Sequence, residues 1–196
     1  MTPLRIGVDF DNTIVSYEGV FHKVALEKGL IPSEIPSSKG AIRNYLRSVG
    51  KEADWTELQG YVYGARMDLA LPYLGVDAFF TLCAKKKIPV FIISHKTKHP
   101  FLGPSYDLHG AAQEWLQKQP FSHCPAFFEL TLQAKLQRIS QQECTIFIDD
   151  LPELLQEPSF PKQVQKILFD PHRLYSSSTA YEYMTSWAEI CEKGWI

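Results

Sequence analysis

The amino-acid sequence predicts an α/β protein with a mainly parallel sheet. Short continuous apolar runs typical of buried strands recur along the chain, and helix-periodic segments separate them. The 196 residues are enough for one well-cored domain, and 45% apolar with 21% charged residues is typical of folded globular proteins. A formal charge of -2 excludes the strongly basic surface of a dedicated nucleic-acid-coating protein.

Five apolar runs are the expected strands. Each is short, rich in β-branched or aromatic residues, and followed by residues that favour turns. Polar residues close three of them. Asp9 and the segment 11–13 close the first, Ser94 closes the second, and Asp149 with Asp150 closes the fourth. The expected strands are 4–10, 88–93, 126–128, 144–148 and 164–169.

Helical periodicity fills the intervals between these strands. Apolar residues recur every three or four positions in segments 76–83, 108–115, 132–139 and 180–191, and Asp107 is a possible N-cap of the second. The interval between the first two strands is much longer than the dozen or more residues that a crossover needs. Its pattern is helical in 20–25, 42–49 and 58–69, so we expect a helical insertion at 16–74 within an α/β core of 1–15 and 75–196.

Acidic and hydroxyl side chains follow three of the expected strands. Ligands of open parallel sheets bind beyond the carboxyl ends of the strands. If the first and fourth strands are neighbours, the carboxylates of Asp9, Asp11, Asp149 and Asp150 converge, and such repulsion requires a cation between them. Ligands that are all oxygen favour Mg²⁺ or Mn²⁺ over zinc.

The same residues carry a resemblance to a known family. Asp9-Phe10-Asp11-Asn12-Thr13, Phe91-Ile92-Ile93-Ser94, Lys135 and Phe147-Ile148-Asp149-Asp150 resemble the four ordered motifs of the haloacid dehalogenase-like (HAD) phosphohydrolase superfamily. The resemblance spans most of the chain. It implies a Rossmann-like sheet of about five strands in the order 5-4-1-2-3, with the insertion forming a small helical cap.

The resemblance also implies a Mg²⁺-dependent phosphatase that acts on a small phosphorylated metabolite. Asp9 would be the nucleophile that forms an aspartyl-phosphate, and Asp11 would be the general acid and base. Asp9, Asp11, Asp149 and Asp150 would hold the metal. Ser94 would hydrogen-bond the transferring phosphoryl group, and a lysine would offset its charge.

Two points stay open within this interpretation. Lys135 is the favoured phosphate-neutralising lysine, although it precedes Asp149 closely and Lys96 follows Ser94 as a competing candidate. Asn12, which replaces the commoner glycine, is a candidate substrate-binding residue together with Thr13, His95 and Lys96. The positive charge of the latter two would suit an anionic substrate.

Other functions remain open as alternatives. A phosphotransferase or mutase could use the same site, and so could a non-catalytic HAD-like binding or regulatory domain. We expect no nucleic-acid or membrane partner, and the oligomeric state is not readable from the sequence. The N-terminus enters the first strand at once and the four cysteines form no CxxC pair, so we expect a cytoplasmic protein with reduced thiols.

Overall fold

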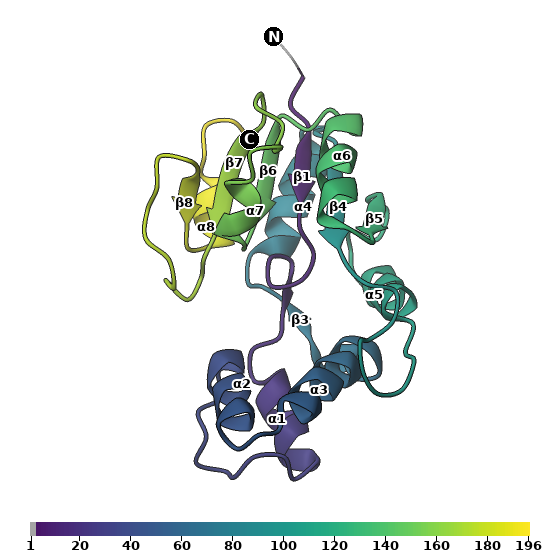
Figure 1. The fold of residues 1–196 in the computed structure, drawn as a ribbon. Helices are drawn as coiled ribbons and strands as arrows, with labels where there is room; N and C mark the ends of the chain where they lie inside the picture. Colours follow the sequence, from purple (N-terminus) through teal and green to yellow (C-terminus); the bar gives the residue numbers. More distant parts are fainter. Residues whose placement is uncertain (1–2) are drawn as a thin grey trace. The chain divides into compact units, whose positions relative to one another are not determined.

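The computed structural model describes residues 3–196, and the fold is shown in Figure 1. The chain divides into two compact units. The first unit comprises residues up to Val15 together with Pro72–Lys96 and Gln119–Ile196. The second comprises Ser16–Leu71 and Thr97–Lys118. The chain passes from one unit to the other through a two-stranded sheet formed by β2 (Val15–Ser16) and β3 (Leu71–Pro72).

The first unit is built on a six-stranded sheet. The order is β5-β4-β1-β6-β7-β8, and all neighbouring strands pair in parallel. The five expected strands occupy the expected positions, so the predicted α/β fold class is confirmed. β8 adds a sixth strand beside β7. The bounds are β1 Ile6–Val8, β4 Val90–His95, β5 Ala126–Glu129, β6 Ile146–Asp149, β7 Gln165–Phe169 and β8 Glu182–Met184.

Helices cover both faces of this sheet, as expected for a parallel sheet whose strands are apolar on both sides. α6 (Leu132–Gln141) and α7 (Pro152–Leu155) cover one face in Figure 1, and their leucines pack with Phe147 in a buried cluster. α4 (Val76–Lys85) and α8 (Trp187–Cys191) cover the other.

The prediction of one helix over 180–191 is wrong. The segment forms strand β8 and then the short helix α8, because the hydroxyl of Ser186 accepts a hydrogen bond from the Glu189 N–H and begins the helix there. Met184 and Trp187 are both buried, the first from a strand and the second from a helix. Because these two buried residues are three positions apart, they show the apolar spacing of one helix although one lies in β8 and the other in α8.

The second unit is helical. α3 packs against α1, α2 and α5, and Trp55, Leu58 and Val62 of α3 are buried. The sequence-based division assigned all of 75–196 to the core, whereas the structure groups Thr97–Lys118 with the inserted helices, because α5 packs on α3. The expected Asp107 cap of α5 is present. The bounds are α1 Val20–Glu27, α2 Lys39–Ser48, α3 Glu52–Gly64, the 3₁₀ helix η1 Met67–Leu69 and α5 Leu108–Gln117.

Within residues 3–196, every helix is too short or too polar to cross a lipid bilayer.

Candidate active site

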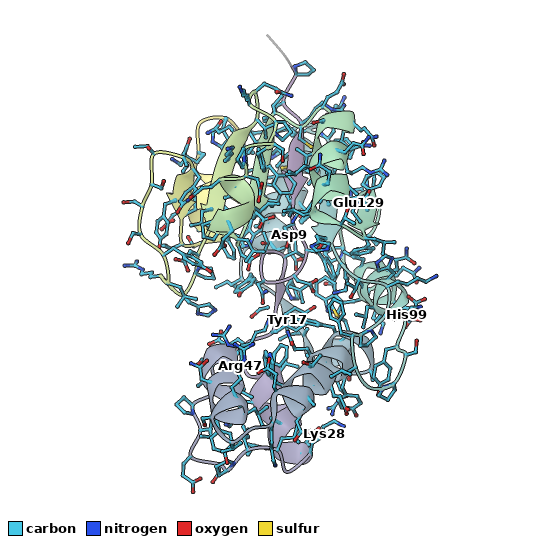
Figure 2. All side chains as sticks on the ribbon, viewed as in Figure 1. Asp9, Tyr17, Lys28, Arg47, His99 and Glu129 are labelled. Carbon is cyan, nitrogen blue, oxygen red and sulfur yellow. The ribbon has the colours of Figure 1, made fainter. Side chains whose placement is uncertain are left out.

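The candidate site lies at the carboxyl ends of β1 and β6, two neighbouring central strands. Val8 pairs with Ile148 in parallel register, and the Asp9 N–H donates to the Ile148 carbonyl at 2.9 Å. Asp9 directly follows Val8 and Asp149 directly follows Ile148, so the two aspartates lie side by side at this edge of the sheet. Figure 2 shows Asp9 at this end of β1.

Lys135 joins these two aspartates. Its Nζ donates to Asp9 Oδ1 at 2.5 Å and to Asp149 Oδ2 at 2.6 Å, so both carboxylates lie within reach of one ammonium group. All three side chains are buried, with exposed fractions of 3% for Lys135, 7% for Asp9 and 0% for Asp149. Asp9 and Asp149 therefore lie close enough for one group to contact both carboxylates.

The position of Lys135 follows from the amphipathic pattern of α6. The helix begins at Thr131, whose hydroxyl accepts from the Ala134 N–H at 3.1 Å. Leu136 and Ile139 pack into the core, and Lys135 lies on the same inward face. Burial disfavours its ammonium form, but Asp149 and Asp9 together raise the pKa of Lys135 above its ordinary value.

Asp11 is held by the other candidate lysine. Lys96 Nζ donates to both oxygens of Asp11, at 3.0 and 2.8 Å, and the Lys96 side chain is 4% exposed. Ser94, on the same strand β4, is also buried, whereas the intervening His95 is exposed. This alternation directs Ser94 and Lys96 to one side and His95 to the other.

A tight turn connects Asp9 to β2 and fixes the direction of Asp11. The Ile14 and Val15 N–H groups both donate to the Phe10 carbonyl, at 3.0 and 2.9 Å. Asn12 adopts a left-handed backbone with φ 59°, which glycine and asparagine tolerate better than other residues. The Thr13 carbonyl accepts from the Trp187 indole N–H at 3.1 Å.

The hydrogen bond from Trp187 to the site turn is a contact that the sequence does not signal. No local pattern links residues 13 and 187, because α8 reaches the turn only through tertiary folding. Asp150, by contrast, lies where expected beside the site. The Thr13 hydroxyl is 3.5 Å from Asp150 Oδ1, and the Leu151 N–H donates to Asp149 Oδ1 at 2.9 Å.

Burial and the neighbouring charges act together on the Asp9 carboxyl. Burial raises the pKa of the Asp9 carboxyl to about 7, with Lys135 opposing this shift and Asp149 and Asp11 adding to it. Lys135 contacts Asp9 and Asp149, and Lys96 contacts Asp11.

The donor atoms fit magnesium. They are carboxylate oxygens without sulfur or imidazole, the set that favours Mg²⁺ in proteins. Within the described residues no three acidic, histidine or cysteine side chains form a preassembled metal cluster. The two lysines explain this, because their ammonium groups contact Asp9, Asp149 and Asp11 directly. Asp9 and Asp149 would therefore hold a metal through carboxylates that also accept hydrogen bonds from Lys135.

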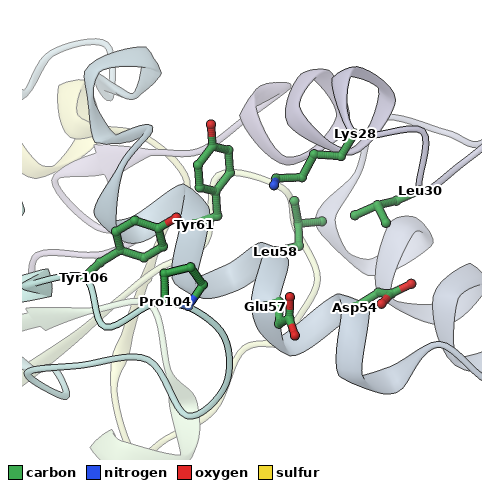
Figure 3. Close-up of a pocket in the computed structure, with 8 residues that line it drawn as sticks. All are labelled: Lys28, Leu30, Asp54, Glu57, Leu58, Tyr61, Pro104 and Tyr106. Carbon is green, nitrogen blue, oxygen red and sulfur yellow. The ribbon is translucent and has the colours of Figure 1, made fainter.

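A separate cavity of about 320 Å³ lies within the second unit (Figure 3). The Lys28 ammonium lies 4.0 Å from the ring centroid of Tyr61 at its wall. Its lining includes none of the predicted site residues. The lining residues are Lys28, Leu30, Asp54, Glu57, Leu58, Tyr61, Pro104 and Tyr106.

Comparison with known proteins identifies the fold. No protein-family model and no curated protein matches the sequence. Solved structures of HAD-superfamily hydrolases and phosphatases, in contrast, match almost the whole chain, and the protein therefore has the HAD-like fold.

Three of these structures illustrate the likeness. A predicted phosphoglycolate phosphatase from Haemophilus somnus 129PT has a TM-score of 0.60 at 10% identity, covering 98% of each chain. A HAD family hydrolase from Deinococcus radiodurans with bound phosphate and sodium has a TM-score of 0.58 at 13% identity, covering 97% of this chain and 94% of the other. A mutant of CbbY from Rhodobacter sphaeroides, in complex with xylulose-(1,5)-bisphosphate, has a TM-score of 0.58 at 12% identity, covering 96% of each chain.

Proposed function

We propose that the protein is a Mg²⁺-dependent phosphatase that hydrolyses a small phosphorylated metabolite through an aspartyl-phosphate on Asp9. The observation that carries this proposal is the buried ion-pair system in which Lys135 holds Asp9 and Asp149 together. A strong nucleophile, a proton donor and a source of positive charge are the parts that phosphoryl transfer needs.

In the first half-reaction, an Asp9 oxygen attacks the phosphorus atom and the bond from phosphorus to the substrate oxygen breaks. Asp11 in its protonated form gives its proton to the departing oxygen, so that an alcohol leaves rather than an alkoxide. Lys135 fixes the direction of the Asp9 carboxylate through its 2.5 Å hydrogen bond. The buried hydroxyl of Ser94 would hydrogen-bond a phosphoryl oxygen.

In the second half-reaction, water attacks the phosphorus atom of the aspartyl-phosphate. Asp11 accepts a proton from this water, the bond between phosphorus and Asp9 breaks, and inorganic phosphate leaves. Mg²⁺ held by Asp9, Asp149, the Asp11 backbone carbonyl and Asp150 would supply positive charge that screens the anionic substrate from the anionic nucleophile.

The solved structures of similar fold support this assignment. They include phosphatases, one hydrolase with bound phosphate, and a sugar bisphosphate complex. The proposal has two further parts, and both stay predictions. The insertion forms a cap over the substrate, and the protein is cytoplasmic. In this arrangement residues 16–74 would exclude bulk water during the first half-reaction.

The proposal is tested by phosphate release from a phosphomonoester, with Mg²⁺ and with a chelator in its place. We expect activity only with Mg²⁺, and a loss of at least about 1,000-fold in kcat for Asp9→Asn. Asp77→Asn is the matched control, because Asp77 is exposed on α4. Equal turnover in chelator, or full activity of Asp9→Asn, contradicts the proposal.

The acceptor is determined in the same reactions by adding alcohols. A phosphatase releases inorganic phosphate in an amount equal to the substrate consumed. Transfer of the phosphoryl group mainly to the alcohol would identify a phosphotransferase that uses the same site.

A further inference from the structure

We infer that Lys96 is a positioning residue for the second half-reaction, holding Asp11 as the base that activates water. The inference rests on the proposed function and deepens it, because it divides the work of the two buried lysines. Lys135 serves the nucleophile Asp9, and Lys96 serves Asp11.

The hydrogen bonds define how the Asp11 side chain is held. An ammonium group carries three donors and no acceptor, so both Asp11 oxygens are acceptors in their bonds to Lys96. The same contacts fix the direction of the carboxylate, since one nitrogen lies 3.0 and 2.8 Å from its two oxygens.

Lys96 is itself held firmly by the sheet. Its backbone N–H donates to the Glu129 carbonyl at 2.9 Å, which continues the pairing of β4 with β5 beyond the end of β4. Its ammonium lies 5.7 Å from the ring centroid of Phe10, and its side chain is almost fully buried. Phe10 immediately precedes Asp11 and is itself buried. A lysine anchored at both ends in this way has little freedom to follow a substrate, which suits a positioning role better than a capturing one.

The role of Lys96 predicts which half-reaction limits the rate when Lys96 is replaced. The water step breaks the bond from phosphorus to Asp9, and its proton goes to Asp11. Loss of Lys96 leaves the nucleophile, Lys135 and Ser94 in place, so formation of the aspartyl-phosphate should continue with a substrate whose leaving group needs no proton. Hydrolysis of the intermediate should slow and become rate-limiting, because its base is no longer oriented.

The test compares wild type with Lys96→Met, Lys96→Gln and Lys96→Arg in steady-state assays with Mg²⁺ and p-nitrophenyl phosphate. The nitrophenolate leaves without needing a proton, so kcat/KM reports phosphoryl transfer to Asp9. We expect kcat to fall about 10- to 100-fold in the Met and Gln variants, with KM falling in parallel and kcat/KM nearly unchanged. Lys96→Arg should recover part of kcat, because it restores a cation that donates hydrogen bonds.

A second measurement observes the intermediate directly. Acid-quenched samples of the Met and Gln variants should carry one phosphoryl group on the peptide that contains Asp9, at higher occupancy than wild type. Lys162→Met is the matched control, because Lys162 is exposed and precedes β7 at the opposite end of the parallel sheet. It should match wild type in both measurements.

The outcomes separate the inference from the function on which it rests. A parallel loss of kcat and kcat/KM, without accumulated phosphoenzyme, would make Lys96 a structural or phosphate-binding residue and overturn the inference. Unchanged kcat in the Met and Gln variants would overturn it as well. Failure of the wild-type protein to release phosphate would instead refute the proposed phosphatase, and the inference with it.

Discussion

Replacing Lys135 with methionine should destabilise the protein strongly, because it removes the ammonium group that bridges two buried carboxylates. Lys135 is 3% exposed and bonds Asp9 at 2.5 Å and Asp149 at 2.6 Å. Methionine fills a similar volume, so the main effect is electrostatic rather than a cavity. Removing one partner of a buried ion pair costs about 3–5 kcal/mol, a large part of the 5–15 kcal/mol that stabilises a typical domain.

The loss should depend on pH with a definite sign. Burial already raises the pKa of Asp9 to about 7 from an ordinary 3.8, so the folded protein binds this proton more tightly than the unfolded chain does. The contribution of Asp9 to stability therefore falls as pH rises between these values. Without Lys135 the pKa of Asp9 rises further, so the deficit should be largest near about pH 8 and smaller near about pH 5.

The assay is urea unfolding of wild type and Lys135→Met in chelator, followed by circular dichroism at both pH values. Lys85→Met is the matched control, because Lys85 is exposed on α4, and it should change the free energy of unfolding by less than about 0.5 kcal/mol. A Lys135→Met deficit below about 1 kcal/mol at the higher pH, or one that grows as pH falls, would refute this account of the site.

Three further predictions concern the framework of the site. Asn12→Gly should leave the melting temperature nearly unchanged, whereas Asn12→Val should cost about 1–2 kcal/mol in urea unfolding, because φ 59° is strained for a β-branched residue; equal effects would contradict this. Gly7→Ala should cost about 1–3 kcal/mol, since its Cβ would lie 2.5 Å from Phe147 Cδ2, and wild-type stability would show that the ring moves freely. Burial raises the pKa of the Cys83 and Cys144 thiols to about 12, so both should resist iodoacetamide near neutral pH until the protein unfolds, and rapid labelling of the native protein, followed by mass spectrometry, would exclude their burial.

Local sequence patterns were sufficient for the central strands and for the residues at their carboxyl ends, and the resemblance to the HAD superfamily implied the strand order. Apolar runs that stop at Asp9, Ser94 and Asp149 are local signals, and parallel pairing brings the ends of such strands to one edge of the sheet. The inward face of α6 also follows a local pattern. Lys135 lies three residues after Leu132 and four before Ile139, which is the spacing of one helical face.

Tertiary structure alone decided how the charges of the site are paired. Sequence left Lys135 and Lys96 as competitors for one role, whereas the fold gives each its own carboxylate partners. It also decided that Thr97–Lys118 packs with the inserted helices and that α8 supports the turn after Asp9 through Trp187. The physical reason is that strand and helix signals depend on near neighbours in the chain. Ion pairs such as that of Lys96 with Asp11 join residues brought together only when the whole sheet forms.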